Sequence, residues 1–162
     1  MLSRRDRHQI RRPWSRLLGS ASLAVATAGM AVAVTPRPAA ADAGSDAAAV
    51  ISTINADRAW FHLPPLATDP ALDWYAAAHS QQMAAAGSIF HSASLLDVGQ
   101  VVPGWSSLGE NVGYGSSVAS VENGFDYSLH HLGNMLGAYD VVGVGVAYSG
   151  GLVYITEEFA QV

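Results

Sequence analysis

Apolar positions recur at helical spacing in the first half of the chain and alternate in its last quarter. Val50, Ile51 and Ile54 form an apolar stripe, which predicts a first helix over residues 47–60. Asp46 precedes this stripe and is the predicted N-cap, because its carboxylate can accept hydrogen bonds from the first free N–H groups of the helix. The stripe is expected to bury one face of this helix against the rest of the domain.

A second helix is predicted from Asp69-Pro70, an N-cap followed by proline at the first helical position, to about Ala86. Gly87 then supplies a C-cap signal. One face of this helix carries Leu72, Tyr75, Ala76, His79 and Met83. On such a face, His79 is interpreted as a hydrogen-bonded core histidine rather than a ligand.

The middle of the chain predicts less regular structure. Residues 88–109 predict a long irregular segment of the kind that often carries function. A short strand is predicted to begin at Gly109, and a turn rich in glycine and serine then leads to a third helix over residues 118–127. This helix leads into a polar stretch that ends at Gly137.

The end of the chain predicts a β-hairpin. Valine and glycine alternate over residues 141–148, residues 149–151 form the predicted turn, and residues 152–159 return as the partner strand. Gly143 and Gly145 allow another backbone to approach the first of these strands closely. Helices first and paired strands last predict an α+β fold, in which helices cover an antiparallel sheet.

The first forty residues have the pattern of an export signal. An arginine-rich start is followed by residues 17–34, which carry no charge, and then by Ala39-Ala40-Ala41, a small-residue cleavage pattern. Residues 1–41 are therefore predicted to be a signal peptide. Residues 42–162 are predicted to be a single secreted domain, a monomer with no stable membrane insertion after cleavage. The apolar run is long for a signal core, so an anchor retained in the cell envelope is the alternative.

Charge and cysteine content narrow the function classes. The chain has 8 Lys+Arg and 13 Asp+Glu, but every arginine except Arg58 lies in residues 1–41, together with Asp6. The predicted mature domain is therefore strongly acidic, which argues against nucleic-acid binding. Arg58 is predicted to be structural and to pair with a carboxylate or with helix-end carbonyls. Without cysteine, any metal site is limited to histidine and oxygen ligands.

Polar groups gather on residues 125–136. In a helix, Ser128 and His131 would share one face, as would His131 and Asn134, whereas His130 would lie about 100° away around the axis. A serine hydrolase built from Ser128 and His131 is disfavoured, because side chains at this spacing rarely align for attack. The chain also has no strained Gly-x-Ser-x-Gly turn.

Two polar positions upstream complete the candidate site. His91 directly follows the second predicted helix, and Glu110 lies beside Asn111 at the start of the predicted short strand. We expect His91, Glu110 and His131 to converge on one cleft. Asn111 and Asn134 are interpreted as side chains that satisfy backbone groups rather than as reactive groups.

Several short motifs follow one another along residues 50–161. They are Asn55-x-x-Arg58, Pro65-Leu66, Asp69-Pro70-x-Leu72, Ala76 with His79 and Met83, Gly109-Glu110-Asn111, Phe125-x-x-Ser128-x-x-His131-x-x-Asn134, Tyr139, Gly143-Val144-Gly145-Val146 and Thr156 to Phe159. In this order the chain resembles the CAP superfamily, also called SCP-like, which includes cysteine-rich secretory proteins, venom allergens and plant pathogenesis-related proteins. Because it has no cysteine, the chain is most similar to the bacterial branch of this superfamily.

The resemblance implies a fold and a site. The fold is α+β, a three-layer α-β-α sandwich with a central, mainly antiparallel sheet. The site is a cleft with two histidines, His91 and His131, and Glu110 as their acidic neighbour. Ser128 stands where many eukaryotic members have a second glutamate, and Phe125 replaces the usual tryptophan.

The two histidines predict a weak metal site. Two imidazoles can each give Zn²⁺ one nitrogen and leave positions open for water. Glu110 could then orient an imidazole or accept a proton from bound water. The alternative is that Glu110 and His131 are simply hydrogen-bonded to each other and pin the helix to the sheet.

Three functions remain open at this point. The first is a secreted binding module, without a confident catalytic residue, whose cleft holds a small apolar or lipid ligand or a protein partner. The second is a metal-dependent hydrolase that uses Zn²⁺ at His91 and His131, with Glu110 as the base. The third is a structural role in the envelope, which applies if the leader is retained.

Overall fold

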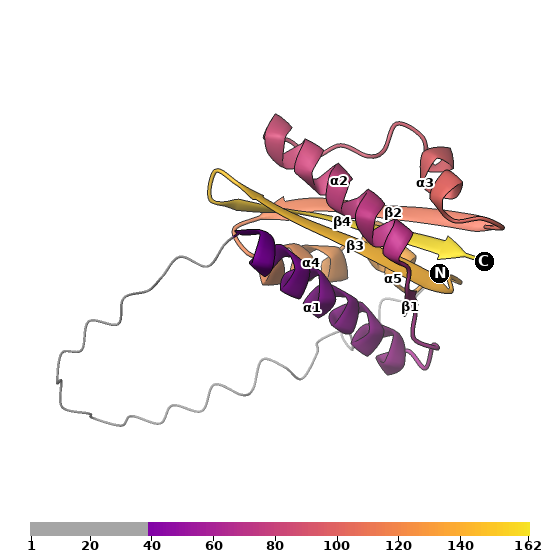
Figure 1. Cartoon of the computed structure of the whole chain (residues 1–162). Coiled ribbons are helices and arrows are strands. Elements are labelled where there is room, and N and C mark those ends of the chain that lie inside the picture. The colour runs from indigo at the N-terminus through magenta and orange to yellow at the C-terminus, as the bar shows by residue number, and fades with distance from the viewer. Residues whose placement is uncertain (1–38) are drawn as a thin grey trace, which may run out of the picture. The chain divides into compact units, whose positions relative to one another are not determined.

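Four strands form one mixed sheet between two layers of helices (Figure 1). The structure is a computed structural model, and it describes residues 39–162. The helices are α1 (Ala39–Trp60), α2 (Pro70–Ala86), α3 (Leu95–Val101), α4 (Val118–Tyr127) and α5 (Leu129–Met135). The strands are β1 (Ala67–Thr68), β2 (Ser107–Gly115), β3 (Val141–Ser149) and β4 (Leu152–Gln161), in the sheet order β1-β3-β4-β2.

The sheet is mainly antiparallel. β3 and β4 form the predicted hairpin, and β2 pairs with the other side of β4, also antiparallel. Among the strands of residues 39–162, only β1 runs parallel to its neighbour, and it pairs with β3 at two positions. The predicted α+β, three-layer α-β-α sandwich is confirmed, with the refinement that the sheet is mixed.

Both faces of the sheet are buried under helices. α2 and α3 cover one face, while α1, α4 and α5 cover the other (Figure 1). On the second face Val142, Val144 and Val146 pack against a cluster that includes Val50 and Phe125. Each fully buried side chain of this size contributes about 1.5–3 kcal/mol relative to exposure, so the two faces together hold the layers in place.

The close approach predicted at Gly143 and Gly145 is confirmed. A Cβ at Gly143 would overlap the backbone of Leu72, and one at Gly145 would overlap the backbone of Ala76. The absence of side chains at these two positions of β3 therefore lets α2 lie directly on the sheet. This contact places His79 of α2 close to the neighbouring strands.

The caps predicted for α2 are also confirmed. Asp69 Oδ1 accepts hydrogen bonds from the N–H groups of Ala71 and Leu72 at 2.8 and 3.0 Å. Gly87 ends the helix in the left-handed region, with φ of 65°. Local capping signals thus set both ends of the helix that supports the site.

The predicted start of the first helix is wrong. α1 begins at Ala39 rather than at residue 47, so Asp46 lies inside it and instead accepts a hydrogen bond from the Tyr148 hydroxyl. The alanine-rich run before Val50 explains the extension, because alanine has the highest helix propensity. The predicted signal peptide lies outside the described residues except for its last three positions, so its cleavage stays a prediction. Between residues 39 and 162, no helix is long and apolar enough to cross a membrane.

Two further predictions need correction. The segment 88–109, predicted to be irregular, contains α3, which begins where Ser94 accepts a hydrogen bond from the Leu96 N–H. The polar stretch is not one helix, because Ser128 has extended backbone (φ −96°, ψ 117°) and separates α4 from α5. Ser128 is therefore the N-cap of α5 rather than a residue inside one continuous helix with His131.

Candidate functional site

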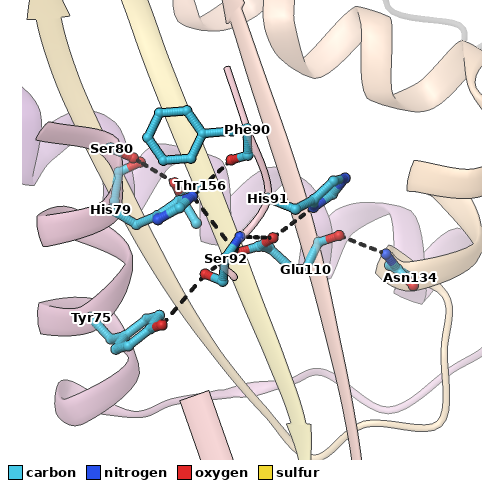
Figure 2. A network of polar contacts seen from close by, with 10 residues as sticks. Tyr75, His79, Ser80, Phe90, His91, Ser92, Glu110, Asn134 and Thr156 are labelled. Atoms are coloured by element: carbon cyan, nitrogen blue, oxygen red, sulfur yellow. Dashed lines mark hydrogen bonds and ion pairs between the residues drawn. The ribbon is translucent and has the colours of Figure 1, made fainter. Parts of the chain in front are cut away.

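Glu110 is the acidic centre of the candidate site. Its Oε1 accepts hydrogen bonds from His91 Nδ1 at 2.6 Å and from the Ser92 N–H at 3.0 Å (Figure 2). Its Oε2 accepts from the Ser92 hydroxyl at 2.6 Å. Burial alone would raise the pKa of Glu110, but the interactions with Ser92, Glu158 and His91 outweigh it and lower the pKa below its ordinary value. Glu110 is therefore a buried, ionised carboxylate.

His91 is fixed on one side and open on the other. Its side chain is 64% exposed, whereas that of Glu110 is 1% exposed. The bond to Glu110 occupies Nδ1 and leaves Nε2 as the nitrogen that an external partner would meet. A carboxylate bonded to one imidazole nitrogen in this way orients the ring and makes the other nitrogen a better ligand or base.

The segment that carries His91 is held by α2. His79 Nε2 donates to the Phe90 carbonyl at 2.9 Å, and its ring meets the Phe90 ring edge-on at 5.2 Å (Figure 2). The Tyr75 hydroxyl reaches the Ser92 hydroxyl at 3.5 Å. The interpretation of His79 as a hydrogen-bonded core histidine is confirmed. It also lies beside the site, with Nε2 3.9 Å from Glu110 Oε2.

His131 on α5 contributes a half-buried imidazole. Its ring lies tilted on Phe125 at a centroid distance of 4.7 Å, and its Nδ1 is buried without a hydrogen-bond partner. Burial, followed by the charges of His91 and His130, lowers the pKa of His131, so the ring is neutral at pH 7. The charge of His91 is one cause of this lowered pKa, but the predicted convergence of His91, Glu110 and His131 on one cleft stays a prediction.

The alternative hydrogen bond between Glu110 and His131 is wrong, because the Glu110 oxygens bond His91 and Ser92 instead. Two asparagines tie α5 to β2 in its place. Asn111 Nδ2 donates to the His131 carbonyl at 3.1 Å, and Asn134 Nδ2 donates to the Glu110 carbonyl at 3.0 Å. This confirms the interpretation of both asparagines as side chains that satisfy backbone groups.

Ser128 stands apart from this network. It ends α4 and precedes α5, and its side chain makes no capping hydrogen bond. A hydroxyl here is shorter than a glutamate side chain and carries no charge. Among the predicted site residues, Glu110 is therefore the one carboxylate, and the structure bonds it to His91.

Sequence reasoning missed three residues of this region, Ser92, Glu157 and Glu158. Burial first, and the neighbouring Glu110 carboxylate second, raise the pKa of Glu158 to about 10. Burial also raises the pKa of Glu157 to about 8, against a smaller opposite effect of the Asn111 hydrogen bond. The available signal was two adjacent glutamates inside the otherwise apolar strand that follows the hairpin turn.

The metal ligands predicted at His91 and His131 stay a prediction. In the part of the chain that the structure describes, no group of three or more His, Asp or Glu side chains is arranged to hold a metal ion. Two imidazoles are fewer protein ligands than the three or four of established zinc sites, so any site here would be weak.

A separate hollow lies at the other edge of the sheet. It has a volume of about 350 Å³ and is formed by α1, α2 and the end of β3. Its lining residues are Ala43, Gln81, Ala84, Ala85, Val146, Ala147, Tyr148 and Ser149. The hollow is open to solvent, and none of the candidate site residues lines it.

Comparison with known proteins identifies relatives of this chain. The family model CAP, described as the cysteine-rich secretory protein family, matches residues 51–160. No curated protein matches the chain.

Three solved structures share the fold. An extracellular protein with an SCP domain from Bacillus anthracis is 24% identical with a TM-score of 0.70, and the match covers 80% of this chain and 44% of that one. An outer surface protein of Borrelia burgdorferi is 16% identical with a TM-score of 0.66 and coverage of 72% and 92%. A cysteine-rich secretory protein of Staphylococcus aureus is 22% identical with a TM-score of 0.62 and coverage of 74% and 39%. The chain thus spans less than half the length of the Bacillus and Staphylococcus proteins.

Proposed function

Because the chain belongs to the CAP family of cysteine-rich secretory proteins, we propose that it is a secreted, non-enzymatic binding module. His91, Glu110 and His131 form its binding site, and its ligand is a small apolar or lipid molecule or a protein partner. The names of two similar structures, an extracellular protein and an outer surface protein, support export, as does the predicted leader. With the leader retained as an anchor, the same module would act at the cell envelope.

The observation that carries this proposal is the state of Glu110. Both of its oxygens accept hydrogen bonds from His91 and Ser92, and its side chain is almost fully buried. Its pKa is lowered, which makes it a weak base. A carboxylate so engaged orients its neighbours, and no second glutamate at Ser128 is present to take a proton. These features favour binding over catalysis.

Apolar side chains beside the site favour an apolar ligand. Phe90, next to His91, is 40% exposed. Tyr127 and Leu129, which precede His131 by four and two residues in the sequence, are 74% and 66% exposed. Exposed apolar side chains grouped near a few fixed polar groups are typical of ligand sites.

A fluorescent fatty-acid analogue tests this function. We expect the purified protein to bind the analogue saturably, and the variants His91→Ala and His131→Ala each to bind it at least about tenfold more weakly, which corresponds to about 1.4 kcal/mol. His130→Ala is the matched control, because His130 is exposed and adjacent to His131 on α5. The measurement is a fluorescence titration. Absence of saturable binding, or binding insensitive to both site variants, contradicts the proposal, and the latter result would direct attention to the hollow near β3.

A second function, a zinc-dependent hydrolase, is favoured by one observation, the bond from His91 Nδ1 to Glu110. Carboxylates oriented in this way commonly support histidine ligands of zinc. His91 and His131 would hold the ion, which lowers the pKa of bound water, and Glu110 would serve as the base after releasing its hydrogen bonds.

Calorimetry with Zn²⁺ separates the two functions. We expect binding no tighter than micromolar, because two histidines leave the ion under-liganded. Both His91→Ala and His131→Ala should abolish it, whereas His130→Ala should not. The hydrolase is ruled out by the absence of histidine-dependent heat at millimolar zinc.

A further inference from the structure

Two adjacent glutamates of β4, Glu157 and Glu158, are paired with the two residues of β2 that support the candidate site. We divide the site into one part that carries His131 and another that carries His91. Glu157 and Glu158 are both fully buried, and successive side chains of a strand point to opposite faces of the sheet. In the ladder with β2, Glu158 pairs with Glu110 and Glu157 pairs with Asn111. Each glutamate therefore meets a different part of the site.

Glu157 acts on the half that carries His131. Asn111 Nδ2 donates to Glu157 Oε2 at 2.8 Å and also to the His131 carbonyl, while Asn111 Oδ1 accepts from Asn134 Nδ2 at 2.8 Å. Only one orientation of the Asn111 amide makes all three bonds, because a reversed amide would place its oxygen against the His131 carbonyl and its NH2 against the Asn134 NH2. Glu157 thus fixes the amide that holds α5 at two points.

Glu158 acts on the half that carries His91. It lies opposite Glu110 on β2, and its neighbour on the other side is Gly143, which has no side chain. The raised pKa of Glu158 leaves it protonated at pH 7, so it presents a neutral carboxyl group to the Glu110 carboxylate. Glu110 in turn holds His91 and Ser92.

We propose that Glu157 and Glu158 are positioning residues, with Glu157 acting on His131 through Asn111 and Glu158 acting on His91 through Glu110. The inference deepens the proposed binding site and depends on it for functional meaning. Burying two carboxyl groups costs several kcal/mol relative to well-packed apolar side chains. A role in holding the site gives a physical reason for two acids at these interior positions.

Nuclear magnetic resonance of the histidine rings tests the inference without a ligand. The ring signals of His91 and His131 are assigned with His91→Gln and His131→Gln and recorded at one fixed pH. Glu157→Met is expected to shift the His131 signals and leave those of His91 in place. Glu158→Met is expected to give the reverse. Each variant serves as the matched control of the other, since both remove an equally buried acid from the same strand.

Rescue by glutamine separates positioning from general support. Glu157→Gln keeps an acceptor for Asn111 and is expected to return the His131 signals close to those of the wild type. Glu158→Gln keeps a neutral donor beside Glu110 and is expected to do the same for His91. Should a methionine variant fail to fold, aspartate at the same position withdraws the carboxyl by one methylene and should produce the same selective shift.

The inference requires a crossed pattern, in which Glu157→Met shifts the signals of His131 alone and Glu158→Met shifts those of His91 alone. Shifts of both histidines in both variants, or of neither, would overturn it. A crossed pattern in a protein that binds no fatty-acid analogue would leave the inference standing and reject the proposed ligand instead.

Discussion

Replacing Arg58 with methionine is expected to lower the free energy of unfolding by roughly 3–5 kcal/mol. Arg58 is 2% exposed, and its guanidinium donates to the carbonyls of Pro64, Met135, Gly137 and Tyr139 at 2.9, 3.0, 2.8 and 3.5 Å. Methionine is unbranched like the arginine stem but is shorter and has no donor, so these buried carbonyls would lose their partner. Urea unfolding followed by circular dichroism measures the change.

The lysine variant tests whether geometry or charge matters at this position. Burial lowers the pKa of Arg58 and Asp140 partly offsets this, but a guanidinium keeps its charge at any pH tolerated by proteins. Arg58→Lys keeps the charge and loses the planar fork that reaches carbonyls in three directions. We expect it to recover less than half of the lost stability. A loss below about 1 kcal/mol for Arg58→Met would contradict the assignment of these bonds as important.

The structural role predicted for Arg58 is confirmed, and its hydrogen bonds to carbonyls at the end of α5 are part of that role. Met135 is the last residue of α5 and Gly137 follows it. Arg58 therefore joins the C-terminal end of α1 to the helix that carries His131. The charge inventory of the sequence was sufficient to single out this residue, but its four carbonyl partners depend on the tertiary fold.

Local signals in the sequence were enough where one segment determines its own structure. The Asp69-Pro70 start and the Gly87 end of α2 are of this kind, as is the turn at Gly150-Gly151. The local signals predicted the wrong helix start where two of them competed. Asp46 has the chemistry of an N-cap, yet the preceding alanines continue the helix past it to Ala39.

The candidate site could be outlined from the sequence but not assembled. His91 and Glu110 are far apart in sequence, and their bond depends on β2 lying beside the segment after α2. The family resemblance placed these residues together, whereas spacing alone did not. Glu157 and Glu158 were missed because an acid in an apolar strand is ambiguous until the pairing partner of that strand is known.

The same two glutamates make the stability of the fold depend on pH. Their pKa values of about 8 and about 10 lie well above the value of about 4.5 expected in the unfolded chain. Between these values the folded protein binds more protons than the unfolded one, so stability falls as pH rises. Two other shifted groups act elsewhere. The lowered pKa of Glu110 matters below pH 4.5, and the lowered pKa of His131 matters below pH 6.5.

The window from pH 6.5 to 8 therefore isolates Glu157 and Glu158. Across it we expect the free energy of unfolding to fall by roughly 3 kcal/mol, about half from each glutamate. Chemical unfolding at several pH values measures this slope. Glu157→Gln and Glu158→Gln should each remove about half of it, while Asp97→Asn, an exposed carboxylate on α3, is the control for loss of an acid as such. A stability that is flat or rising across this window would mean that the two carboxyl groups are ionised in the fold. In that case Glu158 could not present a neutral carboxyl to Glu110, and the support inferred for His91 would fail with it.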